Sequence, residues 1–229
     1  MLRNIKIGVV CALSLTTLAL AEFYNMDFQD LAEQVTIDVN LGSETYTVPV
    51  GTLHFESPDI DGSVYGFCSQ AHVMVADQLA ELHYIMDYDQ YDIEQLRKVG
   101  YAVQTFFPEV YNQPEGQATR DTYAAAAQAV VWEILEESDG NYDITSGNIQ
   151  FDEGPNFSST SDMWLNFQDY FDTMISNLSG MSPDFLPNSD IKIFMMDGAQ
   201  DFVTITTLPE PATIAILGIG MLFVRRRIK

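Results

Sequence analysis

The amino-acid sequence predicts an α+β fold, in which a single domain has a largely antiparallel β-sheet or sandwich and an inserted helical part. Three observations support this prediction. Segments near the front alternate apolar and polar residues, the middle repeats apolar residues at helical spacing, and an Asp-Gly turn separates apolar runs near the end. At 229 residues, the chain has room for one domain with a substantial core and two short terminal signals.

Strand patterns occupy the front of this domain. Residues 35–41 alternate apolar and polar side chains, which is the period of a half-buried strand. A Gly-Ser pair then turns the chain into a second alternating segment, residues 46–50, so the two segments predict a hairpin. Residues 64–68 form a short aromatic run that predicts a third strand, and residues 82–86 predict a fourth.

The middle of the domain predicts helices. Apolar residues at spacings of three and four predict a first helix over residues 93–107, followed by a loop that contains Pro108. A second helix is expected to begin with a cap near Thr119 or Asp121 and to run to about Glu137.

The last part of the domain combines one more helix with two strands. Large apolar side chains form a single stripe from Ser161 to Leu178, which predicts a third helix. Residues 191–196 and 202–206 predict two strands joined by the Asp-Gly turn. Because strands precede and follow the helices, we expect mostly antiparallel pairing.

Residues 1–21 predict a signal peptide that is removed on export. The start of the chain is positive, an apolar run from Ile7 to Leu20 follows, and Ala19-Leu20-Ala21 is a small-x-small cleavage site. The apolar run is short for a membrane span, which makes a membrane anchor the weaker alternative.

Residues 208–229 carry a second signal. A Pro-Glu-Pro triplet precedes the apolar run of residues 212–224, and a basic cluster closes it. In these three parts the tail resembles the PEP-CTERM sorting signal of Gram-negative bacteria. The resemblance implies removal by an exosortase-type membrane protease and delivery to the outside of the cell. The alternative is a weak permanent anchor, because so short a run barely spans a bilayer. The residues that carry the resemblance are Pro209, Glu210, Pro211, Arg225, Arg226 and Arg227.

The domain between the two signals, residues 22–207, is strongly acidic. Residues 22–208 hold four basic side chains and all 33 acidic ones except Glu210, which gives a formal charge of 4 − 32 = −28. Such a charge excludes nucleic acids and other anionic polymers as partners. No His, Cys and Asp cluster has metal-ligand spacing and no Gly-rich loop fits a phosphate, so neither a metal nor another cofactor is expected.

One cysteine remains when the signal peptide is set aside. Cys68 ends the third predicted strand, and a single thiol in an exported protein cannot close a disulfide within its own chain. The thiol is therefore paired between chains, free and reactive, or committed to other chemistry. A glutamine carboxamide held against it offers such chemistry, because sulfur attack on the amide carbon expels ammonia and leaves a thioester. Gln128, on the second predicted helix, is the candidate partner.

Gln128 is expected to face an apolar surface. Its neighbours three and four positions away include Ala124 and Trp132. A buried amide without a partner costs about 1–3 kcal/mol, so another group must meet it. The pattern leaves two interpretations: an amide that hydrogen-bonds backbone at a strand edge, or one that reacts with Cys68. The acidic residues assigned to the opposite side of the helix are Asp121, Glu133, Glu136 and Glu137.

The two motifs together resemble the thioester-domain family of bacterial surface proteins, over roughly residues 30–207. Phe67-Cys68 is similar to the family's aromatic-Cys motif, and the run from Gln128 to Trp132 is similar to its Gln-x-Ala-Ile-Trp-type motif. One departure is Ala127, where many members have threonine. The resemblance implies an internal thioester in which Cys68 is the nucleophile and Gln128 supplies the acyl group. The residues implied to shield this bond from water are Tyr65, Phe67 and Trp132.

These implications predict a secreted or cell-surface protein that captures an amine or a sugar hydroxyl covalently, in adhesion or matrix attachment. Each molecule reacts once, so the protein is not expected to be an enzyme. A rival from another class is a cysteine hydrolase, which needs a histidine base beside Cys68. The histidines are His54, His72 and His83, and His72 or His83 could also assist attack on a thioester. A second rival is a passive acidic protein of an exopolysaccharide or biofilm matrix.

Overall fold

The computed structural model describes residues 22–60, 63–71, 77–137, 140–154 and 161–206. All of them belong to one compact unit, Ala21–Leu208. The predicted signal peptide and sorting tail lie outside the described residues.

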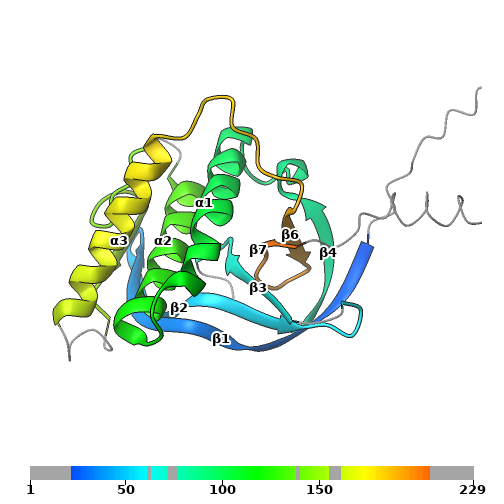
Figure 1. Ribbon diagram of the computed structural model, residues 1–229, viewed down its shortest axis with the longest axis horizontal. Coiled ribbons are helices and arrows are strands. Elements are labelled where there is room, and N and C mark those ends of the chain that lie inside the picture. The colour runs from blue at the N-terminus through cyan, green and yellow to red at the C-terminus, as the bar shows by residue number, and fades with distance from the viewer. Residues whose placement is uncertain (1–21, 61–62, 72–76, 138–139, 155–160, 207–229) are drawn as a thin grey trace, which may run out of the picture. The chain divides into compact units, whose positions relative to one another are not determined.

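The predicted α+β fold is confirmed. Within the described residues, seven strands form one antiparallel sheet, and three α-helices pack to one side of it (Figure 1). The strands are β1 (Glu22–Leu41), β2 (Glu44–Glu56), β3 (Ser63–Cys68), β4 (Gln78–Tyr84), β5 (Ile149–Asp152), β6 (Ile191–Met196) and β7 (Phe202–Ile205). The helices are α1 (Ile93–Asn112), α2 (Thr122–Glu136) and α3 (Ser161–Ser179), with a 3₁₀ turn η1 (Ile85–Asp87) and a π-helical turn η2 (Gln117–Asp121).

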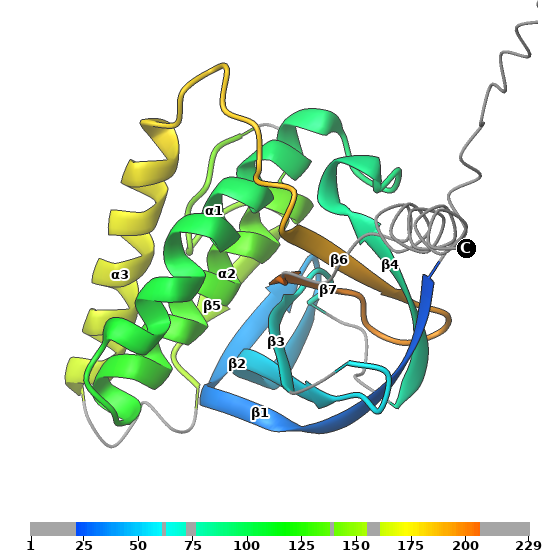
Figure 2. The same cartoon turned by 45° about the vertical axis from the view of Figure 1, so that its right-hand side comes forward.

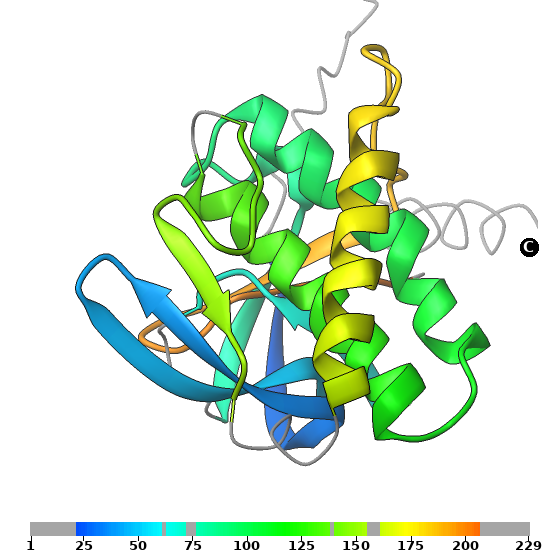
Figure 3. The ribbon, with the colours of Figure 1, turned by 90° about the vertical axis from the view of Figure 1, so that its left-hand side faces the viewer.

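The sheet closes on itself through β1. The first residues of this strand, Glu22 to Met26, pair with β4, and the rest pairs with β2. The ladder then runs from β2 through β3, β7 and β6 back to β4, which makes a ring of six strands (Figure 2). Closure leaves no open edge in the ring. β5 pairs outside it with the far end of β1, beside the β1–β2 hairpin (Figure 3).

Aromatic side chains fill the ring. Phe202 of β7 stacks on Phe55 of β2 with ring centroids 4.5 Å apart, and on Phe194 of β6 at 4.8 Å. All three are fully buried. Parallel rings in contact contribute about 0.5–1.5 kcal/mol beyond the area that they bury. The three strands are thereby fixed around one apolar centre.

Helix α2 lies between α1, α3 and the strands, and all of its residues except Tyr123 and Glu136 are buried. This arrangement corrects the prediction of an acidic outer face. Glu133 is fully buried and Glu137 is 4% exposed. A carboxylate oxygen of Glu137 accepts hydrogen bonds from the backbone N–H groups of Asn148 and Ile149, where the chain leads into β5. The short amphipathic pattern overstated the exposed face, because this helix is covered by other elements on most of its surface.

Several element boundaries also differ from the prediction. β1 begins at Glu22 rather than at residue 35, because register shifts at Phe28/Asp30 and Ala32/Gln34 interrupt the alternation. β5 was not predicted, since its four residues are too few to show a period. β4 covers Gln78–Tyr84, and a 3₁₀ turn follows where a strand was expected to reach residue 86.

The helix ends differ as well. The loop expected at Pro108 is wrong, because α1 continues through that proline to Asn112. Its last turns are held by Phe106 and Val110, which are buried in the core. The second helix starts where it was expected, with Asp121 at the N-cap position, but the Asp121 side chain makes no capping hydrogen bond and its backbone angles are helical. The chain enters α2 through a π-helical turn instead.

Gly66 permits the close crossing of β3 and β7, which gives a first testable prediction. A Cβ at this position would lie 2.6 Å from the Val203 carbonyl oxygen and 2.7 Å from the Phe202 ring. Gly66→Ala should therefore lower the free energy of unfolding by about 1–3 kcal/mol. Urea denaturation measures the change. Gly180→Ala is the control, because Gly180 is exposed and a Cβ there would lie no closer than 3.3 Å to any atom. Equal stability of the two variants would contradict the prediction.

Candidate functional site: a buried cysteine–glutamine pair

Cys68 lies where β3 pairs with β7 in the ring. It is the last residue of β3. β3 pairs with β7 over only two residue pairs, and in one of them Cys68 stands opposite Phe202. Directly opposed residues project to the same face of a sheet, so the Cys68 side chain projects toward the aromatic centre of the ring. The residue is 6% exposed and its thiol is free.

The structure brings Gln128 onto Cys68. Gln128 lies in the middle of α2 and is fully buried. Its Oε1 accepts a hydrogen bond from the backbone N–H of Cys68 at 2.6 Å, and its Nε2 donates to the Cys68 carbonyl oxygen at 2.7 Å. Both hydrogen bonds thus join the Gln128 carboxamide to the backbone of Cys68 and not to its thiol.

The carboxamide takes the position of a missing strand neighbour. Leu53 of β2 stands opposite Gly66, so the same register continued by two residues would place Gly51 opposite Cys68. The β2–β3 pairs end at Leu53 and Gly66, and Gly51 pairs with Gln34 of β1. The Cys68 backbone groups would be buried without partners there, and Gln128 supplies both.

The same geometry fixes the Gln128 carboxamide against the backbone of Cys68. Both hydrogen bonds end on one residue, so the carboxamide carbon of Gln128 is fixed next to the Cα of Cys68. One torsion, χ1 of Cys68, then determines how close Sγ comes to that carbon. The Cys68 N–H points at Oε1, where negative charge would develop if sulfur attacked. A fixed backbone donor at this position is the arrangement of an oxyanion hole.

Burial raises the pKa of the Cys68 thiol well above its usual range. Removal of the charged form from water dominates, and the backbone hydrogen bond only partly opposes it. The neutral thiol is therefore the resting form at neutral pH. General oxidation and alkylation, which use the thiolate, are disfavoured at this position.

Asp201 anchors the chain just beyond Cys68. Its backbone carbonyl accepts hydrogen bonds from the N–H and the hydroxyl of Ser69, at 3.0 and 3.2 Å. Its carboxylate accepts from the Met196 N–H at 2.7 Å and from the Tyr88 hydroxyl at 2.6 Å. No sequence pattern pointed to Asp201, because its partners come from distant parts of the chain.

The three residues predicted to shield the pair lie in different surroundings. Phe67 is fully buried and meets Phe107 of α1 edge to face at 5.4 Å. Trp132 is 3% exposed and stacks on Phe151 of β5 at 6.5 Å. Tyr65 is only half-buried. The shielding roles of all three residues therefore stay predictions.

Two of the three histidines lie close to carboxylates. His54 Nδ1 lies 2.9 Å from Asp30, and His83 Nε2 lies 3.1 Å from Glu81. His72 falls outside the described residues. Among the residues that are described, no group of three or more His, Cys, Asp and Glu side chains could hold a metal ion.

A surface pocket of about 560 Å³ lies near the β6–β7 turn and does not include the cysteine–glutamine pair. Phe23, Glu81 and Met195 line its wall, and Gln70 and Asp201 line the side toward Cys68. Asp201, which lines this pocket, also anchors the chain beyond Cys68 through Ser69.

Comparison with known proteins identifies the tail. Residues 207–228 match the PEP-CTERM protein-sorting motif, and this range includes the Pro-Glu-Pro triplet and the arginine cluster. The protein therefore carries a signal for export and exosortase sorting to the cell surface or the extracellular space. No curated protein and no solved structure matches the chain. In the part of the chain that the structure describes, no helix combines the length and apolarity needed to cross a membrane.

The backbone pairing of Gln128 yields a second testable prediction. Gln128→Ala leaves the buried N–H and C=O of Cys68 without partners, and each such group costs about 1–3 kcal/mol. Cys68→Ala keeps the backbone groups and both hydrogen bonds. We expect Gln128→Ala to be the less stable of the two by at least about 1 kcal/mol in chemical denaturation. Neither variant retains a cysteine–glutamine pair, so the comparison reports the two hydrogen bonds together with the larger cavity that Gln128→Ala leaves. Equal stability of the two variants would show that the hydrogen bonds of Gln128 contribute little to the free energy of unfolding.

Proposed function

We propose that Cys68 and Gln128 form an internal thioester through which this exported protein captures an external amine or sugar hydroxyl, in adhesion or matrix attachment. The observation that supports the proposal most is the pair of hydrogen bonds that fix the Gln128 carboxamide on Cys68 inside the core. A purely structural amide needs no cysteine opposite it, and this is the one cysteine of the domain.

Formation of the bond needs no external reactant. Sγ of Cys68 attacks the carboxamide carbon of Gln128, the C–N bond breaks, and the thiol proton leaves with the amide nitrogen as ammonia. The Cys68 N–H stabilises the oxygen of the tetrahedral intermediate. Holding the two groups in contact replaces a bimolecular encounter, an effect worth up to about 7–11 kcal/mol of barrier.

Capture then consumes the bond. An amine or hydroxyl of the ligand attacks the Gln128 carbonyl, the C–S bond breaks, and the proton of the nucleophile passes to the Cys68 sulfur. The high pKa that burial imposes on this thiol makes it a poor leaving group until water or a ligand reaches it. Buried surroundings therefore protect the bond against hydrolysis. The product is a covalent link formed once per molecule, which is binding and not turnover.

A passive acidic matrix protein is the second candidate. The same two hydrogen bonds satisfy the buried backbone of Cys68 without any bond formation, and the formal charge of 4 − 32 = −28 over residues 22–208 favours a soluble, hydrated surface. The two candidates differ in one measurable property, the mass of the mature protein.

Intact-mass spectrometry tests the thioester directly. The protein should weigh one ammonia less than its sequence and should resist a thiol alkylating reagent until methylamine is added. Methylamine should then add its full mass at Gln128 and release one alkylatable thiol. Mass deficit and methylamine adduct should both disappear in Cys68→Ala and in Gln128→Ala. If the wild-type protein has its full sequence mass and takes up no methylamine, the thioester is excluded and the passive matrix protein remains as the candidate.

Processing of the two signals is a separate prediction. Protein that the native host releases to its exterior should begin after Ala21 and should lack the segment beyond about Pro209. Both signals act before the protein reaches its destination. Peptide mapping of the termini measures this outcome. In a host without an exosortase the tail should remain attached. Tail peptides in protein released by the native host would contradict exosortase processing.

A further inference from the structure

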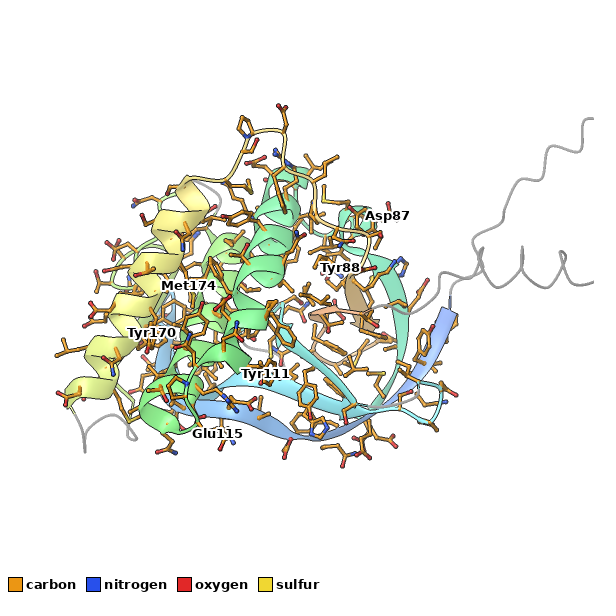
Figure 4. The ribbon with its side chains drawn as sticks, viewed as in Figure 1. Asp87, Tyr88, Tyr111, Glu115, Tyr170 and Met174 are labelled. Atoms are coloured by element: carbon orange, nitrogen blue, oxygen red, sulfur yellow. The ribbon has the colours of Figure 1, made fainter. Side chains whose placement is uncertain are left out.

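An aromatic patch lies on the outer side of β2 and β3, apart from the cysteine–glutamine pair. We define the patch as His54, Tyr65, Phe107 and Tyr111. His54 and Tyr65 stack in parallel at 4.6 Å, and Tyr111 stands at 74° to Tyr65 with centroids 6.3 Å apart. Phe107 meets Tyr111 at the same angle and 5.8 Å. Tyr111 is 41% exposed, beside the strands near the end of α1 (Figure 4).

Carboxylates lie at the margin of the patch, in keeping with the acidic domain. Asp30 lies 2.9 Å from His54 Nδ1, and Glu33 accepts a hydrogen bond from the Thr52 hydroxyl at 2.9 Å. Glu33 and Arg120 act on the Tyr111 hydroxyl in opposite directions. These carboxylates disfavour an anionic ligand, and their oxygens can accept hydrogen bonds from hydroxyl donors.

Tyr111 keeps its hydroxyl proton at neutral pH. Burial raises the pKa of this phenol, and the nearby Glu33 carboxylate raises it further. The hydroxyl can thus donate and accept, beside the ring faces of the patch and the free lone pairs of Asp30, which is an exposed residue. Rings set at a steep angle, with hydrogen-bonding groups at their margin, form an amphipathic surface.

We propose that the aromatic patch binds a neutral polysaccharide. The C–H faces of a pyranose ring would pack on the aromatic rings, and its hydroxyls would donate to Asp30 and Glu33 and exchange hydrogen bonds with Tyr111. A proline-rich peptide fits less well, because it offers few N–H donors to these carboxylates. The proposal does not depend on the thioester, since none of the patch residues takes part in that bond.

Affinity gel electrophoresis of the Cys68→Ala protein tests this binding without any contribution from a thioester. Hydroxyethyl cellulose, dextran and galactomannan are the neutral probes, each cast into a native gel. At least one of them should retard the protein. Tyr111→Ala should weaken the apparent affinity about two- to tenfold, the effect of one lost ring contact. Tyr111→Phe should keep most of the affinity, because it keeps the ring.

Tyr170→Ala is the matched control. Tyr170 is a half-buried tyrosine on α3 that contacts Tyr123 at 5.1 Å, away from the patch (Figure 4). It should leave the retardation unchanged, with thermal melting used to confirm that each variant is folded. Three outcomes would overturn the proposal: no retardation by any of the three probes, equal weakening by Tyr111→Ala and Tyr170→Ala, or Tyr111-dependent binding of a proline-rich peptide with no binding of polysaccharide.

Discussion

The pairing of Gln128 with the Cys68 backbone is the interaction on which the arrangement of this protein depends. It joins the central helix to β3, at the residue where β2 no longer accompanies this strand. The Gln128 side chain replaces the hydrogen bonds of a neighbouring strand, because buried backbone N–H and C=O groups need hydrogen-bond partners. The helix layer and the β-ring therefore meet through two hydrogen bonds and not through apolar contact alone.

Closure of the ring buries Cys68 and keeps it away from solvent. β1 pairs with β4 at its beginning and with β2 along the rest, so one long strand closes the sheet. The short β3–β7 ladder is possible because Gly66 lets the strands cross without a clash. Stacked phenylalanines fill the interior, and Cys68 faces them. Burial keeps the Cys68 thiol neutral, and the same surroundings would protect the proposed thioester from water.

The cysteine–glutamine pair and the aromatic patch share β3 but differ in chemistry. Cys68 ends the strand inside the ring, whereas Tyr65 presents its ring on the outer side with His54 and Tyr111. A surface that holds a neutral polymer reversibly would raise the local concentration of hydroxyl groups near the proposed covalent site. The sorting motif of residues 207–228 places both on an exported protein.

The sequence by itself determined the fold class, the strands from residue 35 to 41 and from 191 to 196, the three helices and the sorting motif, because each rests on local periodicity or a short linear pattern. The candidate pair was also visible, since a lone thiol and an apolar-facing glutamine are features of single segments. The tertiary structure decided what each group touches. It showed that Gln128 pairs with backbone, that Glu133 is buried and that Asp201 anchors the strand end. Ring closure, the passage of α1 through Pro108 and the burial of α2 depend on contacts between segments far apart in the chain. Local patterns do not encode such contacts, because burial is set by the elements that pack on each side.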